Sequence, residues 1–283
     1  MSSSKTMQNW EVFIEAFDKL PEIFKYDFNS IYSFDKPFPY TIYLPKDKNP
    51  FTKRNNTVVS IYNEELYIFE ELDNGIKKII FSFTDIDCIE HGCVLLHSWL
   101  VVSGKSYGKL TSYKIDFNTV TETLFINFIN LIRFPGRICE RLIDAVELCK
   151  LDYMEKLNYK LYGYTLDGLI QGENIVYSIF QPEIVDKKSI FNKVKISPNY
   201  SLVLTMNELI VVCEEQSTSK KRENYGVVFK IIPLKNIERA IKEAYEDKEI
   251  FITKLITVSG YYLKLAYTKD NENNVKGLLK NFS

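Results

Sequence analysis

The sequence has no apolar run long enough to cross a lipid bilayer. Its longest apolar stretch, Cys93 to Val102, covers about ten residues, whereas a membrane-spanning helix needs roughly 20. Within that stretch, His97 and Ser98 interrupt the apolar pattern. Met1 to Gln8 is polar and lacks the apolar centre of a signal peptide. We therefore expect a cytoplasmic protein.

Cysteine and histidine are scarce, with five cysteines and two histidines in 283 residues. An odd number of cysteines at this density is typical of a reducing compartment, where disulfide frameworks are rare. Glycine-rich phosphate loops, G-x-S-x-G elbows and H-E-x-x-H helices are absent from the sequence. The sequence therefore predicts neither a cofactor nor an enzyme.

The chain also lacks a strong excess of charge, since its formal net charge is −1. A split after Leu157 gives 18 basic and 22 acidic residues before it, and 18 and 15 after it, so the halves carry −4 and +3. Neutralising many phosphates requires a concentrated basic face. We therefore do not expect nucleic acid as a partner.

What the sequence does contain is a globular composition. It is 46% hydrophobic, with 19 Phe and 19 Tyr and ordinary numbers of glycine and proline. A chain of this length most often forms two domains, and each half is long enough to bury a core.

The first segment has helical spacing. From Met7 to Phe24 the apolar residues recur at steps of three and four, which predicts an amphipathic helix interrupted near Pro21. From Phe38 onwards the period changes to two, which predicts short strands separated by turn residues such as Asp73-Asn74-Gly75. The expected strands contain Tyr40–Leu44, Val59–Ile61, Leu66–Ile68, Ile79–Phe83 and Tyr113–Phe117. Their order is typical of an antiparallel meander.

Helical spacing returns after Asn118, where Thr119 to Glu122 resembles a capping box. An apolar stripe from Leu124 to Ile132 follows, and Pro135-Gly136 ends the expected helix. Arg137 to Leu157 then has the spacing of a second helix, which we interpret as the connection between two domains.

The second half repeats this order of strands followed by a helix. The expected strands lie within 175–184, 202–204, 209–213, 227–234, 250–258 and 262–267, and a short helix follows from Asn273 to Phe282. Asn63 to Glu71 matches Met206 to Glu214, and Phe83 to Ile86 matches Leu234 to Ile237, at offsets of about 143 to 151 residues. One segment, Ile237 to Tyr245, fits helix at least as well as strand.

Seven antiparallel strands followed by one amphipathic helix in each half resemble the pleckstrin-homology-like (PH-like) fold, and bacterial PH-like domains are the most similar. The residues that carry the resemblance are Glu65–Phe69, Ile80–Ile86 and Lys114–Phe117, and then Glu208–Val212, Ile231–Ile237 and Leu263–Leu265. The resemblance implies a mainly β protein with helices (α+β), in which two tandem bent sheets are each closed by a C-terminal helix. The expected division is an N-terminal helical segment (1–35), a first domain (36–135), a linking helix (136–165) and a second domain (166–283).

The resemblance also implies binding, because PH-like domains generally recognise lipid headgroups, peptides or other domains. Weak candidates for an anion site are the basic residues of the first loop in each half. They are Lys46, Lys48, Lys53, Arg54, Lys187, Lys188, Lys193 and Lys195. Neither loop reproduces the family's spaced Lys/Arg motif, and acidic and amide residues are interspersed, so a solvated loop is the simpler interpretation.

Both histidines and two cysteines lie within ten residues, as Cys88, His91, Cys93 and His97. Zinc accepts all four as ligands, but this spacing would require one strand–turn–strand segment to supply the whole site. A catalytic Cys–His pair is a second reading, although no third orienting group is evident. The structural reading is that Cys88 ends a strand, His91-Gly92 forms a turn, and Cys93 begins the next strand.

The sequence thus favours a binding or scaffold protein that acts through PH-like domains and meets a protein partner. Acidic pairs at strand ends, Glu70-Glu71 and Glu214-Glu215, are read as charges that keep sheet edges apart and not as acid–base catalysts. One alternative is a module that binds an anionic membrane surface, and another is a metal or thiol site at Cys88 to His97. The ligand and the oligomeric state stay open.

Overall fold

The computed structural model describes residues 10–46, 54–135, 144–170, 172–186, 194–215, 226–243, 245 and 249–282. The protein is mainly β with helices, and the strands pair antiparallel, as the sequence predicts. The first half contains β1 (Val12–Ile14), β2 (Tyr40–Leu44), β3 (Thr57–Tyr62), β4 (Glu65–Leu72), β5 (Gly75–Ser82), β6 (Ile86–Val94), β7 (His97–Ser106) and β8 (Lys109–Asn118). Its helices are η1 (Phe17–Lys19), α2 (Glu22–Asn29), η2 (Phe83–Asp85), η3 (Thr119–Thr121) and α3 (Glu122–Arg133).

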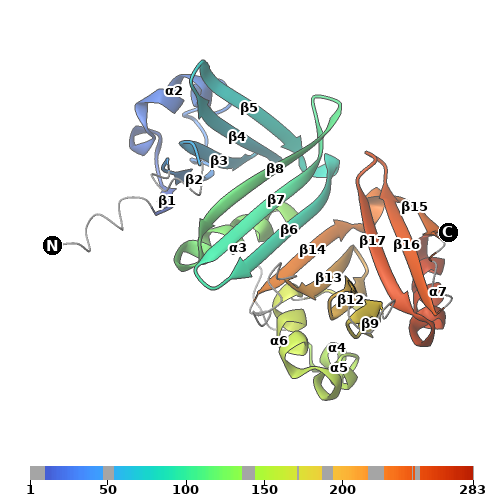
Figure 1. The fold of residues 1–283 in the computed structure, drawn as a ribbon. Helices are drawn as coiled ribbons and strands as arrows, with labels where there is room; N and C mark the ends of the chain where they lie inside the picture. Colours follow the sequence, from blue (N-terminus) through green and yellow to red (C-terminus); the bar gives the residue numbers. More distant parts are fainter. Residues whose placement is uncertain are drawn as a thin grey trace.

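The second half begins with three short helices and continues with strands (Figure 1). Its helices are α4 (Ala145–Cys149), α5 (Asp152–Leu157), α6 (Tyr159–Gly168), η4 (Leu234–Asn236), η5 (Lys269–Asn271), α7 (Glu272–Leu279) and η6 (Lys280–Phe282). Its strands are β9 (Ile175–Gln181), β10 (Ile184–Asp186), β11 (Val194–Ser197), β12 (Tyr200–Thr205), β13 (Glu208–Glu214), β14 (Val227–Pro233), β15 (Ile237–Glu243), β16 (Ile250–Thr257) and β17 (Tyr262–Thr268). None of the helices in the described ranges is long and apolar enough to span a membrane.

The N-terminal segment corrects the first helix prediction. Val12–Ile14 is a strand that pairs antiparallel with β2, and the helix begins only after Pro21. Proline is tolerated at a helix start but not in its interior, because it lacks the amide hydrogen. Helix α2 packs Phe24 and Phe28 against Phe69 on the outer face of the sheet formed by β1 to β5. The spacing of apolar residues therefore reflected one buried face shared by a strand, a turn and a helix.

Strands β6 and β7 correct the expected turn at His91-Gly92. β6 runs through both residues, and the turn falls at Leu95-Leu96, where Leu95 has a left-handed φ of 55°. Gly92 serves a different purpose, because a Cβ placed there would lie 2.0 Å from the ring of Trp99 on β7. Glycine thus makes room for an aromatic ring inside the sheet and does not bend the chain.

The start of η3, the 3-10 turn that leads into α3, differs in detail from the expected capping box. Asn118, and not Thr119, accepts a hydrogen bond from the backbone amide of Val120, at 2.9 Å. The side chain of Thr119 instead shares a hydrogen bond with Ser98, at 2.9 Å. An N-cap amide oxygen satisfies a first-turn amide as a threonine hydroxyl would, so the sequence located the helix start correctly but assigned the wrong cap.

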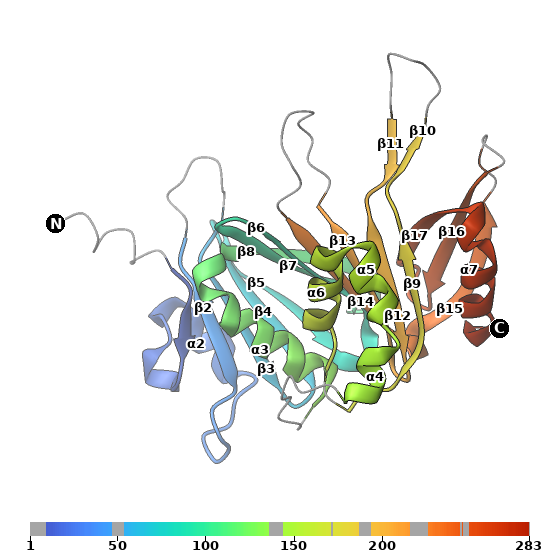
Figure 2. The same ribbon diagram turned by 90° about the horizontal axis from the view of Figure 1, so that it is seen from below.

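The connection between the halves is three helices and not one. Residues 136–143 lie outside the described ranges, and α4, α5 and α6 follow one another with turns at Lys150–Leu151 and Asn158. Asn158 caps α6 by accepting from the amide of Leu161, at 3.0 Å. Helix α6 extends to Gly168, across the boundary expected at residue 165. Figure 2 shows α3, α6, α5 and α4 along one side of the sheets.

Strands of the second half follow the predicted order, and β15 settles the ambiguous segment. Residues Ile237–Glu243 form a strand that pairs with β16, so strand and not helix is correct there. Strands β10 and β11, which lie between β9 and β12 in the sequence, form a separate two-stranded sheet that the sequence did not predict. The C-terminal helix α7 lies where a helix was expected.

The two halves are joined through one continuous sheet. β14 of the second half pairs antiparallel with β6 of the first, which gives the order β8-β7-β6-β14-β13-β12-β9. Lys230 Nζ lies 3.3 Å from Glu90 Oε2 across this junction, which we call the seam. Asn236 donates from Nδ2 to the carbonyl oxygens of Thr84 and Ile86, at 3.2 and 2.8 Å. The two halves are therefore packed against each other and are not separate domains joined by a linker alone.

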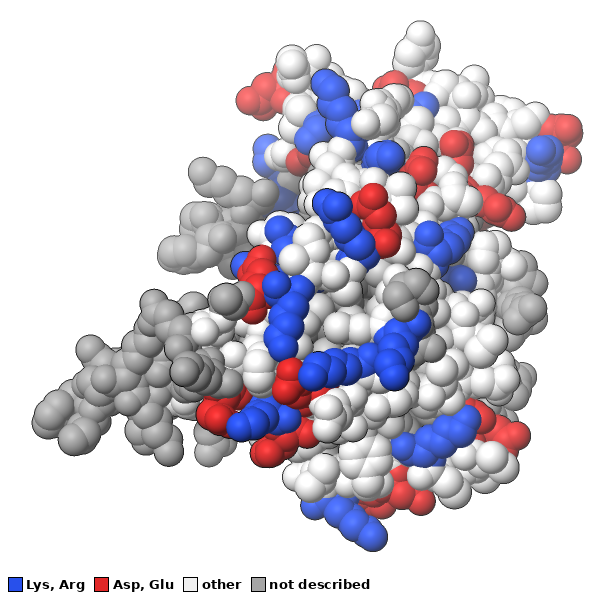
Figure 3. Space-filling view, turned by 90° about the vertical axis from the view of Figure 1, so that its right-hand side faces the viewer, with Lys and Arg blue, Asp and Glu red and all other residues white. Residues whose placement is uncertain are grey.

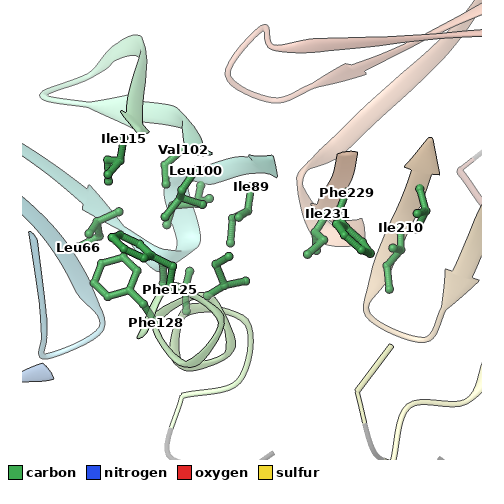
Figure 4. Packing of buried hydrophobic residues seen from close by; sticks show 14 of the residues in the cluster. Leu66, Ile89, Leu100, Val102, Ile115, Phe125, Phe128, Ile210, Phe229 and Ile231 are labelled. Carbon is green, nitrogen blue, oxygen red and sulfur yellow. The ribbon is translucent and has the colours of Figure 1, made fainter. Parts of the chain in front are cut away.

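One hydrophobic cluster also crosses the seam (Figure 4). It combines Ile89 of β6 and Phe125 of α3 with Ile210 of β13 and Phe229 of β14. A second cluster fills the space between the two sheets of the second half, and it includes Cys88 from the first. Because the interior of a protein is close-packed, shared clusters of this kind fix the relative position of the halves.

Candidate functional site

The structure separates the four residues of the Cys88–His97 cluster. Side chains alternate between the two faces of a strand, so Cys88 and His91 point in opposite directions from β6. Cys88 is buried in the core of the second half, whereas His91 lies on the helix-covered face between the rings of Phe117 and Phe229. The two residues cannot ligate one ion together.

His97 is exposed and lies at the beginning of β7. Its Nε2 is 2.8 Å from Asp116 Oδ1, and its ring stacks on Trp99, which covers Gly92. Since Gly92 follows His91 along β6, His97 lies on the face opposite to His91. Within the described ranges, no group of three or more His, Cys, Asp and Glu side chains is placed to hold a metal.

The thiol of Cys88 is poorly suited to nucleophilic chemistry. Burial raises its pKa to about 12, although a hydrogen bond with Tyr261 and the charge of Lys230 act in the opposite direction. The thiolate is the reactive form of cysteine, so a thiol with this pKa stays protonated at neutral pH. The geometry therefore gives a thiol site at Cys88 no support.

The basic candidates are only partly described, because Lys48, Lys53, Lys187, Lys188 and Lys193 fall outside the described residues. Lys46 is exposed.

Arg54 is largely buried; it pairs with the buried Glu11 and donates to the carbonyl oxygen of Asp116, at 2.8 Å. In the second half, Lys195 Nζ lies 2.6 Å from Glu183. Arg54 and Lys195 are thus each paired with a carboxylate of the same chain.

A different site emerges at the seam. A cavity of about 280 Å³ opens between the sheet and the helices, and both halves line it. We call it the seam pocket; its lining is His91, Cys93, Glu122, Ile126, Ile129, Asn130, Arg133, Tyr164, Asp167, Gly168, Val227, Phe229 and Ile231. Strands β6 and β14 form its floor, and helices α3 and α6 form its walls. Concave sites with an apolar body and a few convergent polar groups are typical ligand sites.

His91 is the most enclosed polar group of the seam pocket. The residue is 8% exposed. Its ring lies nearly parallel to those of Phe117 and Phe229, with ring centroids 6.2 and 5.8 Å apart. Its Nε2 is 3.1 Å from Glu122 Oε1, yet this contact lacks the directionality of a hydrogen bond and leaves Nε2 unsatisfied. A buried nitrogen without a hydrogen bond is uncommon and is a natural contact point for a ligand.

Arg133 closes the other end of the seam pocket. It binds the carboxylate of Glu208 through Nη2 and Nε, at 2.7 and 3.0 Å, and donates to the carbonyl oxygen of Gly168, at 3.1 Å. Both charged side chains are about 95% buried, so neither charge is left uncompensated. Beyond this pair lies a second cavity of about 500 Å³, bordered by Glu64, Thr84 and Lys235. The ion pair therefore divides the seam into two compartments.

Sequence reasoning missed every charged residue of the seam pocket. Glu122 was interpreted as part of a cap, and Arg133 was not singled out. Two signals were available, because Arg133 directly follows the buried Ile132 of an apolar stripe and Glu208 begins a strand whose next residues are all apolar. A charge inside such a pattern indicates a buried partner. The partner itself depends on how the halves pack.

Several charged residues of β15 to β17 and α7, away from the seam, form ion pairs. Figure 3 shows the face that carries β15 to β17 and α7, where basic side chains spread across the surface and acidic side chains lie beside several of them. Lys264 lies 2.9 Å from Glu243, and Lys242 lies 2.9 Å from Glu272. The hydrogen bonds from Lys242 and Lys276 keep the pKa of Glu272 below its usual value.

Comparison with known proteins adds no assignment, since no family model matches the chain and no curated protein matches it significantly.

Proposed function

We propose that the chain consists of two tandem PH-like units and is a non-enzymatic binding protein whose partner is another protein. The order of elements supports the two units. In each half, four antiparallel strands precede a 3-10 turn, three further strands, a second 3-10 turn and a terminal helix. These elements are β2–β5, η2, β6–β8, η3 and α3 in the first half, and β9 with β12–β14, η4, β15–β17, η5 and α7 in the second.

A repeated polar clamp gives further support. The side chain of Asn56 donates to Glu71, at 2.5 Å, and the amide of Glu71 donates back to the carbonyl oxygen of Asn56, at 2.9 Å. Asn199 and Glu214 make the same two contacts, at 2.9 and 3.2 Å. The first clamp joins the residue before β3 to the end of β4, and the second joins the residue before β12 to the end of β13. A shared pair of contacts at matching positions is expected of duplicated units.

The single observation that carries the binding proposal is the place of the seam pocket. It lies between the two halves, so its floor and walls exist only when both are present. Units that acted independently would be expected to carry their sites separately. We therefore propose that the pair recognises one partner at the seam, with the sheet as a rigid support.

The test fills the pocket and compares what the full chain binds. Ile126 lines the pocket from α3, and an Ile126→Trp variant should occupy much of its volume. Thr123→Trp adds the same ring to an exposed position of the same helix and is the matched control. Affinity capture from the source cells, followed by mass spectrometry, should return a partner with the wild type and the control but not with Ile126→Trp.

A partner retained in full by Ile126→Trp, with the fold intact by circular dichroism, would place binding elsewhere. The membrane alternative has its own measurement, which is flotation of the full chain with neutral and anionic vesicles. Stronger flotation with anionic vesicles would favour that alternative.

A further inference from the structure

Two charged side chains that line the seam pocket, Arg133 and Glu122, differ in how well their charges are matched. Arg133 is matched by Glu208, which approaches it from β13. Glu122 projects from the first turn of α3 with a quarter of its side chain exposed, and its one ionic contact among the described residues is His91. The three lining residues from β14 are Val227, Phe229 and Ile231, all apolar. Among the described residues, no Lys or Arg side chain forms an ion pair with the carboxylate of Glu122.

We propose that the seam pocket binds an ammonium or guanidinium group carried on an aliphatic chain, such as a lysine or arginine side chain of the partner. Glu122 supplies the counter-charge, and Nε2 of His91 accepts a hydrogen bond from the same group. This inference rests on the proposed function, since it names the ligand chemistry of the same pocket.

The shape and lining of the pocket fit such a group. The volume of about 280 Å³ is many times the ~10–15 Å³ that a cavity needs to hold one water, so a five-atom lysine side chain fits. Ile126, Ile129 and Phe229 offer apolar contact to the methylene chain. Long cationic side chains bury their stems in this manner while the charged end meets polar groups.

His91 is the second, independent observation. Its side chain is 90% buried, it lines the pocket, and its Nε2 has no hydrogen bond. An imidazole nitrogen that carries no hydrogen accepts a hydrogen bond, and an ammonium or guanidinium group supplies only donors. An anion would meet Glu122 instead and be repelled. The lining therefore selects for a donor-rich cation over a carboxylate or a phosphate.

The experiment titrates the full chain with small probes and follows binding by NMR or calorimetry. The probes are n-butylamine, the isosteric neutral n-butanol and the anion butyrate. We expect n-butylamine to bind the wild type and to bind Glu122→Gln about tenfold more weakly, as expected for loss of a charged hydrogen-bond partner. Glu155→Gln removes an exposed carboxylate on α5, outside the pocket, and should change nothing.

Peptides with a central lysine or with norleucine in its place distinguish the source of the cation. Tighter binding of the lysine peptide than of n-butylamine identifies a protein side chain, and the reverse identifies a free amine. Preference for butyrate, or an affinity for n-butylamine unchanged by both Glu122→Gln and Ile126→Trp, would overturn the inference. If amines fail to bind but partner capture still responds to Ile126→Trp, the inference is wrong and the proposed function stands.

Discussion

At the scale of single residues, Gly92 shows how one missing side chain supports a sheet. Because a Cβ at this position would lie 2.0 Å from Cζ2 of Trp99, Gly92→Ala should displace the ring and destabilise the protein by about 1–3 kcal/mol. Gly163→Ala is the control, since nothing lies within 4 Å of its added Cβ in α6 and alanine favours helix. Urea denaturation should therefore show changes of opposite sign.

The ring can be identified as the cause by a double variant. In Gly92→Ala/Trp99→Leu the added methyl group no longer meets an indole, so the two substitutions should be less costly together than the sum of their separate effects. Additive effects would show that the glycine is needed for another reason.

Asp87 is a buried carboxylate beside the seam, where desolvation raises its pKa even though Thr257 and Ser259 hydrogen-bond to it. An acid whose pKa is higher in the folded than in the unfolded state loses stability as pH rises from the unfolded pKa, near 4, through the folded value. Asp87→Asn removes this cost. We expect it to stabilise the protein at pH 7 by on the order of 1 kcal/mol, and by less at pH 4.

The comparison should be made by urea denaturation of both proteins at the two pH values, because other carboxylates then cancel in the difference. A stabilisation independent of pH would show that the effect of Asp87→Asn does not arise from its charge.

At the scale of elements, Asn118 caps η3, the 3-10 turn that leads into α3. Asn118→Ala removes the acceptor for the amide of Val120 and should cost about 1 kcal/mol, whereas Asn118→Asp keeps an acceptor and should cost less. Thermal unfolding followed by circular dichroism measures both. A larger loss with Asp than with Ala would contradict the capping role, and η3 would then owe its start to packing alone.

The residues of the outer strands agree with which of those strands gain a further partner. β6 and β15 occupy corresponding places in the two halves, but only β6 has a strand, β14, along its outer side. The residues of β6 that face the helices include Ile89, His91 and Cys93, whereas β15 carries Glu238, Arg239 and Lys242. Charged side chains on an outer strand discourage further pairing. The composition of each strand thus agrees with its place in the sheet.

At the scale of the whole molecule, the shared sheet and the cluster that crosses the seam predict one cooperative unfolding transition. Circular dichroism and tryptophan fluorescence should report the same midpoint in urea, because Trp99 lies in the first half while strands of both halves contribute to the far-ultraviolet signal. Two separated transitions would show that the halves are energetically independent.

A fragment of residues 1–135 gives a second measure of this dependence. Without β14, the outer edge of β6 and the apolar face that contains Ile89 would be exposed to solvent. We expect the fragment to self-associate in size-exclusion chromatography with light scattering, in contrast to a half that folds alone. A monodisperse, folded monomer would contradict the prediction.

The sequence by itself determined the local elements of this protein. Alternating apolar residues or short apolar runs placed β2 to β5 and β12 to β14, because alternation reflects one buried face of a sheet and a short run reflects a strand buried on both faces. Turn residues such as Asp73-Asn74-Gly75 marked the hairpins, since their backbone preferences are local. Where one pattern fitted two elements, as in the N-terminal segment and in Ile237–Glu243, the spacing of apolar residues recorded burial and left the type of element open.

Only the tertiary structure decided how the two halves meet, and with that the candidate site. The pairing of β6 with β14 joins segments about 140 residues apart, and no local preference of either strand specifies it. His91 and His97 are close in sequence, yet they lie on opposite faces because a strand alternates. Arg133 and Glu208 are far apart in sequence, yet they form a buried ion pair, because close packing across the seam brings α3 against β13.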